Sequence, residues 1–170
     1  MQNFKKIFNK VYNSHIEKIY RFVFLKVSSE EIAQDLTSET FLRFWERVKR
    51  SQDSEITNPN AFLYQIAKNL IIDHYREKGR VQLVSTENTN INISDPRIDL
   101  EKDANLSSDL EQAQKALKQL KEEYQDVVIW YYLDDLSVPE IAEILDKSEN
   151  AVRVTIHRAL SSLRKTMSDK

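Results

Sequence analysis

Side chains that can read nucleic-acid bases gather on one side of a predicted helix that follows Ser148. Arginine and asparagine can form paired hydrogen bonds with base edges, and the N-terminal half of such a helix fits into the major groove of DNA. The same pattern also suits an amphipathic helix whose charged face is merely solvated. The candidate base-reading residues are Ser148, Asn150, Arg153, Val154, His157 and Arg158.

A sharply bent pair of helices between Leu136 and Lys165 is predicted to position this face. Ser137 is expected to cap the first helix, with Glu140 three residues later as in a capping box. Asp146 occupies the corner where glycine is common, and aspartate tolerates a left-handed backbone better than most residues. We therefore predict a helix-turn-helix. Its inward-facing residues are expected to be Ile141, Ala142, Leu145, Ala151, Val152, Ile156, Ala159, Leu160 and Leu163.

The composition predicts an all-α protein. The chain has 170 residues, with one glycine and three prolines, and is rich in residues that favour helices. It has no cysteine, which excludes disulfides, thiolate zinc sites and cysteine nucleophiles. We find neither a signal peptide nor a membrane span, so we expect a cytoplasmic protein without membrane insertion.

Enzymatic functions lack the residues that they need. His15, His74 and His157 are far apart and have no metal-ligand partner at helical spacing, so neither a metal site nor a cofactor is expected. A phosphate-cradling loop needs several glycines, and the chain has one. The adjacent Asp134 and Asp135 would point in different directions on a helix, so they indicate a turn rather than a pair of catalytic carboxylates.

Charge is unevenly distributed, although the formal net charge is only -2. Cations predominate in residues 68–80 and 147–165, whereas residues 87–111 are mostly acidic. Two basic patches separated by an acidic connector predict two contacts with nucleic acid.

Three amphipathic patterns in the N-terminal half predict a small helical bundle. They occupy residues 4–24, 30–48 and 59–78. Gly79 is predicted to end the third helix as a left-handed residue. Residues 81–106 are too polar and too rich in turn formers to pack, so we predict a flexible acidic linker. The predicted domains are residues 1–80 and 107–170.

Three segments, in this order, resemble the extracytoplasmic-function (ECF) group of bacterial RNA polymerase sigma factors in the sigma-70 family. Asp35–Trp45 is similar to the family's region-two segment, with Ser38 where glutamine is usual. Ala61–Arg76 is similar to the promoter-melting segment, with Phe62 where tryptophan is common, and Val152–Ala159 matches region four. The resemblance covers nearly the whole chain. It implies a sigma factor that directs core polymerase to promoters and promotes their opening for transcription initiation.

The resemblance also implies three contact surfaces. The helix-turn-helix would bind the minus-thirty-five element and the polymerase flap. The third helix would bind the minus-ten element as a single strand, and the second would bind the clamp helices of the largest polymerase subunit. An anti-sigma factor is a further expected partner. The residues implied for the minus-ten element are Tyr64, Lys68, Asn69, Asp73, His74, Arg76, Lys78 and Arg80. The residues implied for core polymerase are Asp35, Ser38, Glu39, Phe41, Leu42 and Arg43.

Two other functions are compatible with parts of the sequence. A dimeric transcriptional regulator would join a sensing N-terminal domain to the same helix-turn-helix. An interaction module that has lost DNA binding is slightly favoured by Val154 and Thr155, where the family often has small polar or basic residues. The segment from Asn69 to Arg80 favours the sigma factor, because a ligand-sensing domain does not need this mixture of aromatic and cationic residues.

Overall fold

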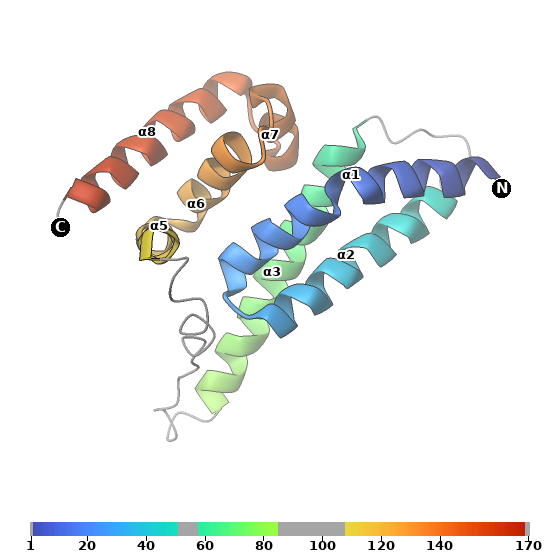
Figure 1. The fold of residues 1–170 in the computed structure, drawn as a ribbon, viewed down its shortest axis with the longest axis horizontal. Coiled ribbons are helices and arrows are strands. Elements are labelled where there is room, and N and C mark those ends of the chain that lie inside the picture. The colour runs from blue at the N-terminus through green and yellow to red at the C-terminus, as the bar shows by residue number, and fades with distance from the viewer. Residues whose placement is uncertain (1, 51–57, 85–107, 169–170) are drawn as a thin grey trace.

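The computed structural model describes residues 2–50, 58–84 and 108–168, and every regular element in these ranges is a helix (Figure 1). The prediction of an all-α fold is therefore confirmed. In chain order the elements are α1 (Gln2–Val27), α2 (Glu30–Arg50), α3 (Pro59–Val84), α5 (Ser108–Gln119), α6 (Glu122–Val128), the short π-helix η2 (Ile129–Leu133), α7 (Val138–Leu145) and α8 (Glu149–Ser168).

Helices α1, α2 and α3 form an N-terminal unit, in which α1 lies beside α2 and α3 packs against both (Figure 1). Two of the helix starts have a side-chain cap. The Ser29 hydroxyl accepts a hydrogen bond from the Ile32 N–H at 3.3 Å, and the Asn58 side chain accepts one from the Ala61 N–H, also at 3.3 Å. The fully buried apolar side chains of this unit include Ile19, Phe22, Val23, Phe44, Leu63 and Ala67.

The third helix is longer than predicted, because α3 continues through Gly79 to Val84. The prediction that Gly79 ends the helix in a left-handed conformation is wrong, since its φ angle is not positive. A single glycine inside a helix costs about 1 kcal/mol, which is too little to end an otherwise continuous helix. The predicted linker therefore overlaps the last residues of α3, and most of it lies outside the described residues.

Helices α5 to α8, with η2, form a C-terminal unit in which α6 and α7 both pack against α8. The predicted helix-turn-helix is present as α7 and α8. The Ser137 hydroxyl accepts the Glu140 N–H at 3.2 Å, and the Glu140 carboxylate accepts the Ser137 N–H at 3.0 Å, so the capping box is confirmed. Asp146 follows α7 in the left-handed conformation, with φ 56° and ψ 49°, as expected for the corner.

The buried side of α7 differs from the prediction at one residue. Ile141, Ala142 and Ile144 are buried, whereas Leu145 is only half-buried. The reason is that α7 contacts α3 as well as α8, so more than one of its sides is covered. Leu145 instead lines a cleft between the two units.

The two units are in direct contact, mainly through α3 and α7. Trp130 of η2 is the largest side chain at this contact, and its exposed fraction is 0%. Its ring centroid lies 5.4 Å from that of Phe22 and 6.0 Å from that of Tyr64, both in the N-terminal unit. The contact therefore has an apolar centre made by aromatic side chains from both units.

Candidate nucleic-acid interface

The outward face of α8 contains five of the six residues predicted to read bases, and all five are exposed. These residues are Asn150, Arg153, Val154, His157 and Arg158. On the opposite side of α8, Val152, Ile156 and Ala159 are buried in the C-terminal unit. The sixth residue, Ser148, precedes the helix, and its hydroxyl caps it by accepting the Ala151 N–H at 3.1 Å. This exposed face of α8 is therefore held in place by a packed core behind it.

Arg153 makes one contact on this face, an ion pair with Glu149 one turn earlier on the same helix. The guanidinium and carboxylate lie 3.4 Å apart, and both side chains are about half-exposed. An exposed pair of this kind contributes about 0.3 to 0.5 kcal/mol. The guanidinium can therefore exchange Glu149 for a base edge at little cost.

The predicted minus-ten residues lie along α3, and six of them have side chains that reach solvent. Asn69, Asp73, Arg76 and Lys78 are exposed, whereas Lys68 and His74 are half-buried. Arg80 also lies on α3, but its side chain lies outside the described residues. Between Asn69 and Lys78, α3 therefore presents an amide, cations and carboxylates to solvent.

His74 differs from its cationic neighbours in charge. Burial and the nearby Lys78 ammonium lower the pKa of His74 below its ordinary value of 6.5. The ring is therefore neutral at neutral pH, and it lies 5.4 Å from the ring of Tyr75 in an edge arrangement. In this position His74 can stack or hydrogen-bond as a neutral ring, but it does not add a positive charge.

Tyr64 is the predicted minus-ten residue that cannot reach DNA in this arrangement, because its exposed fraction is 0%. Its hydroxyl donates to Asp134 at 2.7 Å, and its ring meets Phe22 and Trp130. Burial and the Asp134 carboxylate raise the pKa of Tyr64, so the hydroxyl stays protonated and acts as a donor. In this structure Tyr64 therefore packs between the two units and contacts residues of both.

Asp134 is the polar centre of the contact between the units, and its exposed fraction is also 0%. Besides Tyr64, it binds the Arg21 guanidinium of α1 at 2.5 Å, and Arg21 also donates to the Leu133 carbonyl at 2.8 Å. Burial raises the pKa of Asp134, although the hydrogen bonds from Arg21 and Tyr64 lower it. The predicted turn at this point is confirmed, since Asp135 adopts φ 56°. The role of Asp134 was not predicted, because its partners are distant in sequence.

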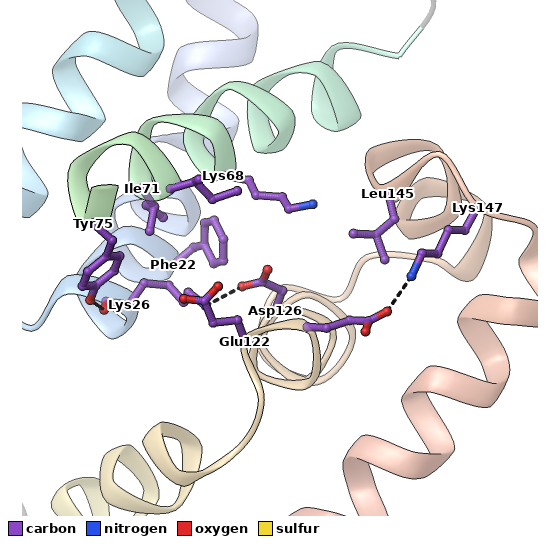
Figure 2. A pocket seen from close by; sticks show the side chains of 11 residues that line it. Phe22, Lys26, Lys68, Ile71, Tyr75, Glu122, Asp126, Leu145 and Lys147 are labelled. Carbon is purple, nitrogen blue, oxygen red and sulfur yellow. Dashed lines mark hydrogen bonds and ion pairs between the residues drawn. The ribbon is translucent and has the colours of Figure 1, made fainter. Parts of the chain in front are cut away.

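A second buried ion pair joins the units beside a cleft of about 250 Å³. The Lys26 ammonium of α1 lies 2.9 Å from the Asp126 carboxylate of α6, and it also donates to the Gln125 side chain at 3.1 Å. Burial raises the pKa of Asp126, although Lys26 lowers it. Figure 2 shows Lys68 of α3 extending into the same cleft, opposite Leu145 of α7. Lys68 is therefore partly enclosed by the C-terminal unit.

Polar side chains complete the contact between the start of α3 and α7. Asn58 donates to the Glu143 carboxylate at 2.8 Å, and Asn60 donates to the Glu140 carboxylate at 2.9 Å. Gln65 donates to the backbone carbonyl of Glu143 at 3.0 Å. Burial raises the pKa of Glu140, but hydrogen bonds from Ser137 and Asn60 lower it by more, so the pKa lies below its ordinary value. These contacts were not predicted, because none of the residues shows a local signal for them.

The surface predicted to bind polymerase lies on α2 and is mixed in character. Asp35, Ser38, Leu42 and Arg43 are exposed, and Glu39 is half-buried and pairs with Arg43 at 3.0 Å. The exposed fraction of Leu42 is 51%, which is high for a leucine. Phe41 departs from the predicted surface, because it is 4% exposed and packs against Tyr12 at 4.9 Å between ring centroids. Three of these residues, Ser38, Phe41 and Leu42, line an apolar groove of about 490 Å³ between α1 and α2.

Two family descriptions match this chain: "Sigma-70 region 2" over residues 11–81 and "Sigma-70, region 4" over residues 110–163. The chain is 32% identical to the ECF RNA polymerase sigma factor SigW of Bacillus subtilis, in a match that covers 95% of this chain and 89% of SigW. It is 28% identical to the ECF RNA polymerase sigma factor BldN of Streptomyces coelicolor over 95% of this chain. That match covers 61% of BldN, so this chain spans about three fifths of the length of that relative.

A solved structure has the same fold. It is the sigma factor RpoE of Bartonella quintana in complex with the anti-sigma factor NepR, and its TM-score to this chain is 0.73. The identity is 21%, and the match covers 99% of this chain and 98% of the other. Within the described ranges, none of the helices combines the length and the apolar character needed to cross a membrane. By the match with SigW and the two sigma-70 regions, the chain belongs to the ECF family of RNA polymerase sigma factors, which are not enzymes.

Proposed function

We propose that this chain directs core RNA polymerase to specific promoters and promotes their opening. The observation that carries the proposal is the exposed face of α8, where Asn150, Arg153 and His157 project from a capped helix-turn-helix. A second surface with cations and an amide lies on α3, in the other unit. Two separate surfaces suit a promoter that has two recognition elements.

The α8 face is assigned to the minus-thirty-five element. The Arg153 guanidinium can pair with guanine, and Asn150 can pair with adenine in the major groove. The exposed fraction of Val154 is 47%, and its side chain can contact a thymine methyl group. Arg164 and Lys165 lie about three turns further along α8, so we assign them to phosphates rather than to bases.

The exposed part of α3 is assigned to the minus-ten element in its single-stranded form. The Asn69 side chain can hydrogen-bond to a base that has left the stack. Arg76 and Lys78 provide positive charge for the backbone, which positions the strand without reading its sequence. His74, as a neutral ring, is suited to stacking with a base.

The α2 surface is assigned to the clamp helices of the largest polymerase subunit, and the C-terminal unit to the flap. Exposed Leu42 lies on α2 together with the charged residues Asp35 and Arg43, and this mixture suits a polar interface with an apolar anchor. An anti-sigma factor is a further proposed partner, as it is for the similar RpoE. This function would place the protein in the cytoplasm.

Promoter opening tests the assignment of α3. Asn69→Ala should reduce the permanganate reactivity of thymines in the minus-ten element, because the variant lacks the amide that holds a flipped base. Asn13→Ala is the matched control, since Asn13 is exposed on α1 and outside the proposed surfaces. Equal reactivity and equal base preference for both variants would contradict the assignment of Asn69.

Binding to core polymerase tests the assignment of α2. Leu42→Asp should weaken binding at least tenfold, because it places a charge where the proposed interface has an apolar anchor. Ile7→Asp is the control, since Ile7 is an exposed apolar residue on α1 and lies outside the proposed surfaces. Similar affinities of the two variants for core polymerase would show that Leu42 does not lie in the polymerase-binding surface.

A further inference from the structure

The cleft of about 250 Å³ between the two units is lined by side chains from both (Figure 2). Phe22 of α1, Ile71 of α3 and Leu145 of α7 give it apolar walls. Cavities of about 150 Å³ bind benzene, and sites for drug-sized ligands begin at about 300 Å³. The cleft therefore has room for one ligand that is somewhat larger than benzene.

Six charged side chains of the described residues line the cleft, three cationic and three acidic, and four of them form two ion pairs. The inner pair is Lys26 with Asp126, whose charged atoms lie 2.9 Å apart and whose side chains are 6% and 7% exposed. The outer pair is Lys147 with Glu123, at 2.6 Å, and these side chains are 44% and 43% exposed. The four charges cancel in pairs, so they offer little attraction to a ligand.

Lys68 of α3 and Glu122 of α6 are the other two charged residues of the cleft, and within the described ranges neither has an ion-pair partner. They come from opposite walls, and the half-buried Lys68 side chain extends across the cleft (Figure 2). Both act on the inner carboxylate, since Lys68 lowers the pKa of Asp126 and Glu122 raises it. Partial burial of a charge without a partner costs free energy that a bound counter-charge offsets. The cleft therefore offers one positive and one negative charge to a ligand.

We infer that this cleft is a binding site for a small zwitterion, an amino acid with a short apolar side chain. Lys68 pairs with the carboxylate of the ligand, and Glu122 pairs with its ammonium group. The apolar side chain of the ligand lies against Phe22, Ile71 and Leu145. A simple anion would leave Glu122 without a partner beside it, and a simple cation would do the same for Lys68. A zwitterion satisfies both charges and leaves the cleft neutral.

The site lies apart from the surfaces assigned above to promoter DNA and polymerase, and its chemistry does not depend on those assignments. Lys68 is the one lining residue that the family resemblance also implies for the minus-ten element. Ligand binding is therefore measured directly, on the full chain without polymerase or DNA. Failure of the ligand site and failure of the proposed function can then be recognised separately.

L-Leucine is the probe, because it combines both charges with a short apolar side chain. It is titrated into the full chain with labelled isoleucine and leucine methyl groups, and their NMR signals are followed. Signals of Ile71, Ile72 and Leu145 should shift with half-saturation at about 1 mM ligand, whereas that of Ile7, outside the cleft, should stay in place. No saturable shift up to about 50 mM, or shifts spread over all methyl groups, would overturn the inference.

Two analogues of leucine test whether both charges are recognised. Isocaproate lacks the ammonium group, and isopentylamine lacks the carboxylate. Each should bind at least tenfold more weakly than leucine, because one charged hydrogen-bond partner in the cleft is left without its counterpart. Equal affinity for leucine and either analogue would show that the cleft does not select a zwitterion.

Variants of the two charged residues assign the partners. Lys68→Met should bind leucine no better than isopentylamine, and Glu122→Gln should bind leucine no better than isocaproate. The matched controls Lys10→Met and Glu17→Gln, both on the exposed side of α1, should retain the full preference for leucine. If either cleft variant kept that preference while its methyl spectrum remained that of the folded chain, the inference would be overturned.

Discussion

The hydrogen bond from Tyr64 to Asp134 should contribute more to stability than the shorter ion pair from Arg21 to the same carboxylate. Tyr64→Phe removes only the hydroxyl, which donates at 2.7 Å to a charged group that is fully buried. A hydrogen bond to a charged partner contributes about 1.5 to 3 kcal/mol. We therefore expect this variant to lose about 2 kcal/mol of the free energy that holds the units together.

Arg21→Met removes the ion pair, whose two charged atoms lie 2.5 Å apart. The Arg21 side chain is 46% exposed, so solvent screens much of its attraction to Asp134. The exposure of Arg21 lowers the contribution of this pair toward the value of about 0 to 1 kcal/mol that applies to ion pairs between exposed side chains. The expected order of destabilisation is therefore Tyr64→Phe first and Arg21→Met second, although the distances alone suggest the reverse.

Trp130 provides the assay, because it lies within the contact between the units. Trp45→Phe leaves Trp130 as the one remaining tryptophan of the chain, so that its fluorescence during urea titration reports the loss of this contact. A double-mutant cycle with Asp134→Asn then isolates the Tyr64 interaction, for which we expect a coupling of about 1 to 2 kcal/mol. A larger loss for Arg21→Met than for Tyr64→Phe, or a coupling near zero, would refute the reasoning from burial.

Three further predictions concern single residues. Arg153→Ala should cost about 1 to 3 kcal/mol at one base pair of the minus-thirty-five element, whereas Arg164→Ala should lower binding evenly across sequences. Transcription from a promoter library randomised at that element measures both effects. An even loss for Arg153→Ala together with a base-specific loss for Arg164→Ala would contradict the prediction. The pKa of His74 in the folded chain lies below its ordinary value of 6.5. At pH values between these two pKa values the unfolded chain binds more protons than the folded chain, so the free energy of unfolding should fall as the pH decreases through this range. His74→Gln should reduce that fall between about pH 7 and about pH 5.5 in urea titrations, and an unchanged pH dependence would argue against the shift. Asp146→Val should destabilise the helix-turn-helix by about 1 to 2 kcal/mol because Asp146 is left-handed, whereas Asp146→Gly should not; equal melting temperatures for the two variants would contradict this.

Local chemistry allowed much of the fold to be predicted from sequence. The capping box of Ser137 and Glu140, and the left-handed Asp146, depend on residues within a few positions of one another, so the sequence alone contains the information. The outward face of α8 follows in the same way from helical periodicity. The same local reasoning failed at Gly79, where the signal of one glycine was weaker than the continuity of the helix.

Only the tertiary structure determined which of the candidate residues are accessible. Tyr64 has the sequence context of a DNA-contacting residue, yet it is buried because a turn that begins 70 residues later brings Asp134 to its hydroxyl. Phe41 is likewise covered by α1, although its segment suggested a binding surface. Asp134 showed only the signal of a turn, and its partners Arg21 and Tyr64 come from two other helices. Periodicity shows which side of a helix is apolar, but it does not show which other helix, from which unit, will cover it, because that depends on contacts between distant parts of the chain.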